Sequence, residues 1–156
     1  MQAAPPIDLD GHTAPSALGV GAHQAHLQAS ATQAGVPCSD CHLVPDSTYS
    51  PGHLDTALPA EVTFAGVSLS GGAAPQWNRA AATCAGTWCH GPSDPTGSVS
   101  PEWTSSDGPL GCASCHLTPP PDPHPPMAEC WNCHGNVDEN LQIVDPALHV
   151  NGTVDF

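Results

Sequence analysis

The sequence has almost no positive charge and no long apolar run. It contains no lysine and a single arginine, Arg79, against 15 acidic residues, and its net charge is −14. Nucleic acids and anionic membrane surfaces are bound mainly through Lys and Arg, so we expect neither as a partner. No apolar stretch approaches the roughly 20 residues that a membrane-spanning helix needs, which excludes a membrane span from the prediction.

Large apolar side chains are also too few to build an ordinary core. Leu, Ile, Val and Phe together number 25 of 156 residues, and a further 21 residues are alanine. This composition with a high net charge is typical of disordered chains. The 19 prolines and 15 glycines discourage long helices and strands. We expect one domain, 1–156, of mostly irregular coil with a few short helices and minimal strand, ordered by something other than side-chain packing.

The eight cysteines form four pairs, and a histidine follows each pair directly. Three pairs have a two-residue gap, in Cys38–His42, Cys112–His116 and Cys130–His134. The fourth pair, in the wide motif Cys84–His90, has a gap of four residues. Since 10 of 156 residues are histidine, this arrangement would arise by chance on the order of once in 6×10⁴ sequences.

A disulfide framework or zinc sites would explain paired cysteines but not the histidines. C-x-x-C-H is the attachment signature of haem c, in which two thiols form thioethers with one haem and the histidine binds its iron. One helical turn can present both sulfurs and the imidazole across a two-residue gap. The wide motif needs a bulged loop, and Gly86 can provide the turn. We therefore expect four haem c groups, attached through Cys38, Cys41, Cys84, Cys89, Cys112, Cys115, Cys130 and Cys133, with His42, His90, His116 and His134 as proximal iron ligands.

Six further histidines are available as second, distal ligands of the haem irons. His53, His124 and His149 follow the proximal histidines of three motifs by 11, 8 and 15 positions. His23 and His26 precede the first motif at helical i,i+3 spacing, so they share a face and either or both could reach a haem. The expected distal ligands are His26, His53, His124 and His149, with His23 and then His12 ranked below them.

Local patterns predict the structure of the segments around the motifs. Residues 1–21 are rich in Pro, Gly and Ala and are expected to form an extended arm. Residues 22–34 indicate a short helix that ends before a glycine. Residues 60–69 have the apolar alternation of a strand. Residues 75–90 are alanine-rich and begin with a proline suited to a helix start, and residues 91–111 are expected to be turn-rich coil.

These residues resemble the multihaem c-type cytochromes of metal-respiring bacteria that combine CxxxxCH with CxxCH sites. The resemblance covers nearly the whole chain and is carried by Gly21–Leu27, Gly52-His53, Trp77–His90, Cys112–His124 and Cys130–Asn151. It implies an irregular polypeptide wrapped around closely packed haems with two histidine ligands each. It also implies an exported, periplasmic or extracellular protein used in long-range electron transfer. Since the sequence shows no secretory apolar region, we expect this numbering to describe a mature form without its signal peptide.

With about 39 residues for each of four haems (156/4), the haems should lie close together and pass electrons without substrate chemistry. We therefore expect an electron conduit rather than an enzyme. Its partners would be other redox proteins, extracellular electron acceptors or further copies of the chain, because related small cytochromes polymerise into filaments. A leading arm, spare histidines and a strand-like tail at 153–156 favour a filament. A soluble periplasmic carrier, a reductase with one open iron and a zinc-stabilised module remain alternatives.

Overall fold

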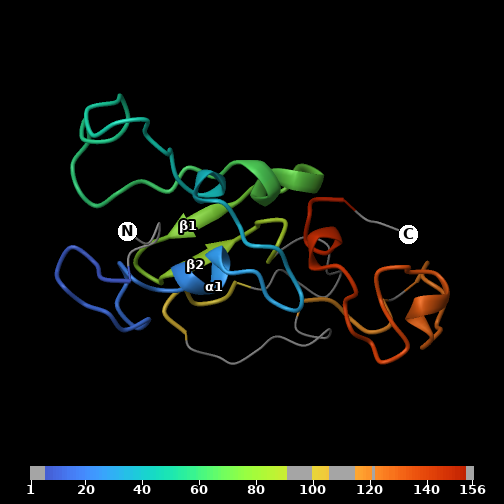
Figure 1. The fold of residues 1–156 in the computed structure, drawn as a ribbon. Helices are drawn as coiled ribbons and strands as arrows, with labels where there is room; N and C mark the ends of the chain where they lie inside the picture. Colours follow the sequence, from blue (N-terminus) through green and yellow to red (C-terminus); the bar gives the residue numbers. More distant parts are fainter. Residues whose placement is uncertain (1–5, 91–99, 106–114, 121, 154–156) are drawn as a thin grey trace.

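The computed structural model describes residues 6–90, 100–105, 115–120 and 122–153. In this part of the chain, coil and turns connect a few short helices and one two-stranded sheet (Figure 1). The expectation of a mostly irregular chain with short helices and minimal strand is confirmed at this coarse level. With η marking a 3-10 helix, the elements are α1 (His23–Leu27), η1 (Cys38–Asp40), η2 (Gly66–Gly72), β1 (Gln76–Asn78), β2 (Thr83–Ala85), η4 (Cys130–Asn132) and η5 (Pro146–Leu148).

The helix predicted for residues 22–34 is real but ends early, at Leu27. The Ser30 hydroxyl accepts hydrogen bonds from the backbone N–H groups of Thr32 and Gln33, at 3.1 and 3.2 Å. Such local side-chain bonds offer the backbone an alternative to the helix ladder. The chain then turns back so closely that a Cβ atom at Gly35 would collide with the carbonyl oxygen of Leu27. The glycine therefore permits this close return rather than ending the helix.

The alanine-rich segment 75–90 forms a hairpin, so the helix prediction for it is wrong. Strands β1 and β2 pair antiparallel, and Trp77 lies directly opposite Cys84. In the turn between them, the Asn78 side-chain oxygen accepts a hydrogen bond from the N–H of Ala81 at 3.1 Å. This Asn bond favours a turn over a helix, and Trp is a good strand former. Together they outweigh the helix propensity of the alanines.

The strand predicted for residues 60–69 is also absent. Its backbone instead bonds to the first cysteine motif, where Thr63 N–H donates to the Cys41 carbonyl at 2.8 Å and Ala65 N–H to the Asp40 carbonyl at 2.9 Å. The chain continues into η2, a 3-10 helix that is kinked near its end. The apolar alternation in 60–69 therefore belongs to a segment that is hydrogen-bonded to the turn of the first cysteine motif, and not to a strand of a sheet.

The chain before α1 forms successive hydrogen-bonded turns. Asp8 N–H donates to the carbonyl of His12 at 3.0 Å, and Val20 N–H to the carbonyl of Ala17 at 3.0 Å.

The coil predicted for 91–111 lies mostly outside the described residues. Its described part, 100–105, joins the sheet through an isolated antiparallel bridge between Glu102 and Thr83.

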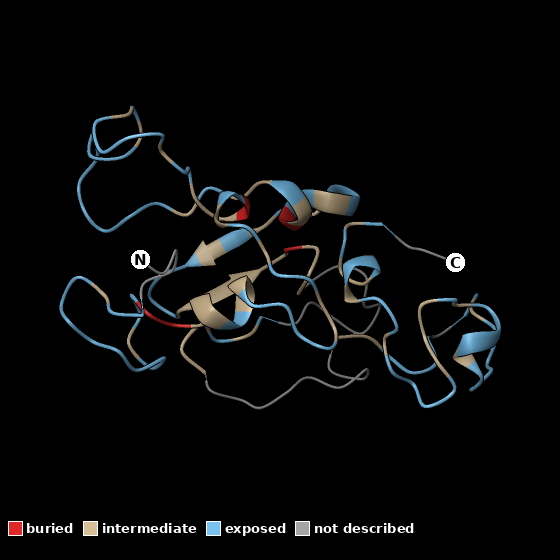
Figure 2. Cartoon of the chain, viewed as in Figure 1, coloured by how far each residue is buried: buried red, intermediate tan, exposed pale blue. Residues whose placement is uncertain are grey.

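Side-chain packing contributes little to this fold. Among the described residues, Val20 is the one buried hydrophobic side chain, and the buried polar residues are Asp40, Ser68 and Thr87. Figure 2 shows these positions as isolated spots on a largely exposed or half-buried chain. A folded protein of 15.9 kDa is expected to expose about 7,400 Å², whereas this chain exposes 10208 Å². In the part of the chain that the structure describes, no helix has the length and apolar character needed to cross a membrane.

Candidate cofactor site

Two of the tight cysteine motifs adopt the same local structure, a single 3-10 turn. In η1, the N–H groups of Cys41 and His42 donate to the Cys38 carbonyl at 3.2 and 2.9 Å. In η4, the equivalent bonds from Cys133 and His134 to the Cys130 carbonyl have the same lengths. One turn thus carries both cysteines and the histidine, as the spacing predicts. In the third tight motif, Cys112 lies outside the described residues.

The wide motif absorbs its two extra residues in the way the sequence suggests. Cys84 belongs to β2, and the chain then turns at Gly86 with a φ of +66°. The N–H of His90 donates to the carbonyl and the hydroxyl of Thr87, at 3.3 and 3.1 Å. The prediction that Gly86 supplies a turn between the two sulfurs is confirmed. The Cys89-His90 junction follows directly after that turn.

The cysteines of the first and wide motifs lie near one another. Burial, together with smaller contributions from the neighbouring Cys84, Asp40 and Cys89, raises the pKa of the Cys41 thiol to about 11. Burial also raises the pKa of Cys89, with smaller contributions from Asp40 and from Cys115 of the third motif. Three motifs therefore converge on one region. No disulfide joins any two of the seven cysteines that the structure describes.

The described residues do not gather into a zinc site of cysteines and histidines. Among them, the one group of three or more His, Cys, Asp or Glu side chains with all ligand atoms within 4.8 Å of one another consists of Asp8, Asp10 and His12. Tetrahedral structural zinc needs four such ligands, usually with several thiolates. The arrangement of the described thiols therefore counts against zinc.

The histidines share one hydrogen-bonding pattern. In eight of them the ring nitrogen Nδ1 lies within hydrogen-bonding distance of an oxygen, which is a backbone carbonyl in seven cases. A carbonyl only accepts, so Nδ1 carries the proton and Nε2 of the neutral ring keeps its lone pair. Metal-binding histidines almost always have this arrangement. The seven are His23, His26, His42, His53, His116, His124 and His149, while His12 bonds Asp8 instead.

Three of the four proximal histidines face a second histidine ring. The ring centroids are 6.1 Å apart for His23 and His42, 6.0 Å for His26 and His90, and 6.1 Å for His124 and His134. Imidazole nitrogen binds a transition metal at about 2.0 to 2.1 Å, and the ring centroid lies roughly 1.15 Å behind it. Two imidazoles on opposite sides of one metal ion thus have centroids roughly 6.4 Å apart. All three observed centroid spacings lie within a few tenths of an ångström of this value, with ring planes inclined by 27°, 74° and 6° respectively.

Burial keeps two of these rings neutral at neutral pH. Burial lowers the pKa of His90 to about 4, with a smaller contribution from the nearby His26. It also lowers the pKa of His23, against a hydrogen bond to the Val20 carbonyl that raises it. A neutral imidazole is the form that binds metal. Both rings therefore have the protonation state that a ligand needs.

The other candidate distal histidines lie elsewhere. The structure brings His23 opposite a proximal ring, although the sequence ranking placed it below His53 and His149. The histidine–histidine ring pairs of the described residues are His23 with His42, His26 with His90 and His124 with His134, so they include none of His53, His149, His12 and His116. His53 belongs to an exposed loop, where Nδ1 lies 2.8 Å from the Thr48 carbonyl. The sequence feature that pointed to His23 was its i,i+3 helical spacing from His26.

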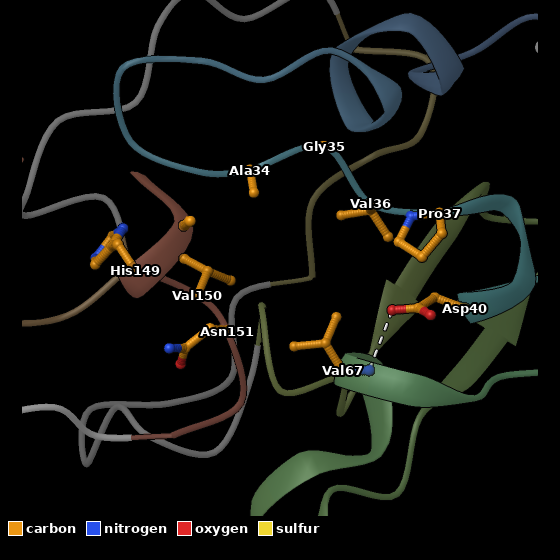
Figure 3. A pocket seen from close by; sticks show the side chains of 10 residues that line it. Ala34, Gly35, Val36, Pro37, Asp40, Val67, His149, Val150 and Asn151 are labelled. Atoms are coloured by element: carbon orange, nitrogen blue, oxygen red, sulfur yellow. Dashed lines mark hydrogen bonds between the residues drawn. The ribbon is translucent and has the colours of Figure 1, made fainter. Parts of the chain in front are cut away.

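A small cavity lies beside His149. It has a volume of about 160 Å³, below the roughly 300 to 1,000 Å³ of typical small-molecule pockets. Figure 3 shows His149 on one side and Val67 and Asp40 on the other, with the Asp40 carboxylate accepting a hydrogen bond from Val67 N–H at 3.1 Å. The cavity joins the first motif to the segment after η5. Its size does not suit a macrocycle.

Trp77 offers a donor that the polypeptide does not use. Its indole Nε1 is buried and has no hydrogen-bond partner in the part of the chain that the structure describes. A buried donor without an acceptor costs about 1 to 3 kcal/mol. Its position directly across the hairpin from Cys84 puts it beside the wide motif. An acceptor brought by a bound group would remove this cost.

No protein-family profile, curated protein or solved structure matches the chain.

Proposed function

We propose that this chain is a tetrahaem c-type cytochrome that transfers electrons. The observation that carries the proposal is the set of three histidine pairs, each with centroids 6.0 to 6.1 Å apart and each containing a proximal histidine of a C-x-x-C-H or C-x-x-x-x-C-H motif. The cysteines Cys38/Cys41, Cys84/Cys89, Cys112/Cys115 and Cys130/Cys133 would each hold one haem covalently. Bound haem iron supplies one-electron chemistry, cycling between the ferric and ferrous states.

The histidines would supply both axial positions of three irons. We pair His42 with His23, His90 with His26, and His134 with His124. The carbonyl bonds to Nδ1 orient the rings of His23, His26, His42 and His124 and raise their basicity as ligands. Two histidine ligands leave no position for an exogenous molecule, which favours electron transfer over catalysis at these centres.

The first two centres would be immediate neighbours because α1 serves both. His23 and His26 are three residues apart on one helix, where the rise is about 1.5 Å per residue. Each faces the proximal histidine of a different motif, His42 or His90. A single helix of five residues would therefore hold ligands of two haems. This closeness favours rapid electron exchange between them.

The low burial of the polypeptide suits the proposal. The chain exposes about 10208 Å² and buries one hydrophobic side chain among its described residues. Four large apolar macrocycles would bury much of that surface and replace the missing core. The N–H of Trp77, which has no acceptor among the described residues, and the donor set of cysteines and neutral histidines also fit a haem.

The haem propionates would find few cations, because Arg79 is the single basic residue besides histidine and its guanidinium donates to the Ala60 carbonyl at 2.8 Å.

The surplus of acidic residues bears on the redox properties. A net charge of −14 favours the ferric over the ferrous state of a haem iron. We therefore propose low reduction potentials. The proposal includes export to the periplasm or the cell exterior, with other redox proteins and extracellular electron acceptors as partners.

The third motif separates two versions of the proposal. His116 has no facing histidine in the described part of the chain, and three candidate histidines, His12, His53 and His149, are not paired. A second copy of the chain could supply the missing ligand, which would favour polymerisation into a filament. An open iron at His116 would instead favour a reductase.

Covalent haem is the first test of the proposal. The chain would be expressed with a cytochrome c maturation system, and pyridine haemochrome absorbance would be compared with protein concentration. We expect four haems per chain, with low-spin spectra from at least three. Absence of covalent haem would refute the proposal.

Electron microscopy of the haem-loaded protein at high concentration tests whether the chain forms a filament. The finding of only monodisperse monomers would exclude a filament. Carbon monoxide binding by one haem in those monomers would support an open iron at His116.

A further inference from the structure

Trp103 connects three segments that are far apart in the sequence. Its backbone N–H bonds the Ala82 carbonyl in the hairpin turn at 2.6 Å. Its indole Nε1 donates to the Leu18 carbonyl at 2.9 Å, across 85 positions of sequence. The residue is thereby held at its backbone by the hairpin and at its indole ring by the turn that leads into α1. It is a fixed side chain in a part of the molecule with almost no side-chain core.

The indole contacts both histidines of α1. Its centroid lies 4.7 Å from that of His23, with the rings nearly perpendicular at 87°. It lies 5.5 Å from that of His26, with the rings tilted by 32°. Both distances are in the range of favourable aromatic pairs, which attract each other beyond the effect of the area they bury. One side chain thus contacts a member of two different histidine pairs.

Helix α1 cannot hold its histidines in place unaided. It has five residues, no side-chain cap at its N-terminus and no buried residue. Isolated helices of this length are unstable in water, since most helical stability in proteins comes from tertiary packing. The indole supplies that packing on the face that carries both histidines.

The backbone before α1 is shaped to receive the indole. Gly21 has a φ of +45°, and a Cβ atom there would collide with Nε1 of Trp103. The left-handed conformation and the close approach both require glycine at this position. Trp103 and Gly21 therefore form a matched contact, which distinguishes this indole from one that merely covers a surface.

We propose that Trp103 is a positioning residue that holds His23 and His26 opposite His42 and His90, and so couples the ligation of two neighbouring haems. This inference rests on the proposed haem function. Removal of the indole should loosen two of the four haems together and leave the centre of His124 and His134 unchanged. A purely structural role would instead disturb all four centres or none.

The test compares Trp103→Ala, Trp103→Phe and Trp131→Ala in haem-loaded protein. Trp131 lies in η4, within the fourth motif, and is 38% exposed, so it provides a control at a distant centre. The readouts are total covalent haem, electron paramagnetic resonance of the ferric state, and carbon monoxide binding by the ferrous state. Covalent haem is read separately because the cysteines, not the histidines, retain the macrocycle.

We expect Trp103→Ala to keep four covalent haems but to lose the low-spin signal from up to two of them, with matching carbon monoxide binding. Trp103→Phe should restore most of this signal, because it keeps an aromatic ring although it loses the bond to Leu18. A shift in the signals of two haems in Trp103→Phe supports the inference even where Trp103→Ala does not accumulate.

Three outcomes would overturn the inference. The first is a Trp103→Ala protein with unchanged low-spin signals, and the second is equal loss at all four haems. The third is a Trp103→Phe protein with signals identical to the wild type when Trp103→Ala does not accumulate. A wild-type chain without covalent haem would instead overturn the proposed function, and this inference with it, before any variant is compared.

Discussion

Replacing Gly86 with alanine should destabilise the protein by about 3 kcal/mol, by a route that the structure defines. Gly86 has a φ of +66°, and the left-handed region costs a residue with a Cβ atom about 1 to 2 kcal/mol. The added Cβ would lie 2.7 Å from the Ala74 carbonyl oxygen. That oxygen is backbone and cannot rotate away, so the forced shift adds roughly 1 to 3 kcal/mol. The lower entropy of alanine in the unfolded chain offsets about 0.4 to 1 kcal/mol.

Two other glycines provide matched controls for this substitution. Gly72 has a φ of +80° with nothing within 4 Å of the added Cβ, so Gly72→Ala tests the backbone conformation without the collision. It should cost about 1 kcal/mol or less. Gly135 is open and outside the left-handed region, and Gly135→Ala should change stability by about 0.5 kcal/mol at most. The order of the three variants separates strain from collision.

The measurement is equilibrium unfolding of the haem-loaded protein by denaturant, with a thermal scan alongside. A loss of 3 kcal/mol in a chain of this length corresponds to a fall in Tm of roughly 6 to 12 °C. Gly86→Ala should also lower the haem content below four per chain, because the turn positions Cys84 relative to Cys89. If Gly86→Ala and Gly72→Ala unfold within about 0.5 kcal/mol of each other, the collision with Ala74 is not real.

The axial and covalent roles of single residues give two further predictions. His26→Ala removes the ring opposite His90, so one haem of four should lose its low-spin signal in electron paramagnetic resonance. His53→Ala is its control in monomeric protein and should leave all signals unchanged, because that ring faces no proximal histidine. Cys84→Ala should leave one haem tethered through Cys89 alone, with His90 still bound to iron. Its pyridine haemochrome band should shift for one haem in four, while mass spectrometry still finds four haems.

Each of these has a result that contradicts it. A His26→Ala protein with as many low-spin haems as the wild type would show that the pairing with His90 is wrong. Loss of a low-spin signal in monomeric His53→Ala would show that His53 reaches a haem within one chain. Loss of a whole haem from Cys84→Ala would show that Cys89 alone does not retain it.

The local structure was predicted best where the spacing of the cysteines decides it. The turns of η1 and η4 followed from the two-residue gap, and the turn at Gly86 followed from the four-residue gap. The strand prediction for 60–69 and the helix prediction for 75–90 both failed, the second also because the Asn78 bond and Trp77 favour a hairpin. Local propensity is weak, and here the backbone of both segments bonds to distant parts of the chain, including Cys41 and Glu102.

The candidate haem attachment sites could be read from the sequence because each is contained in at most seven consecutive residues. Two thiols and an imidazole must meet one group, so their spacing is chemically restricted and recognisable without any knowledge of the fold. The expectation that nucleic acids and anionic membrane surfaces are not partners also needs no knowledge of the fold. A chain with one arginine and no lysine cannot present a Lys- and Arg-rich surface in any conformation.

Which histidines lie close to the motif histidines was decided by tertiary structure. His124 lies ten positions before His134, whereas His26 meets His90 across 64 positions, and no local pattern encodes that approach. It depends on the chain turning back at Gly35, on the hairpin that carries the wide motif and on Trp103 beside α1. Long-range contacts form only when several segments fold together, so proximity in sequence favoured His53 while the folded chain brought His23 opposite His42.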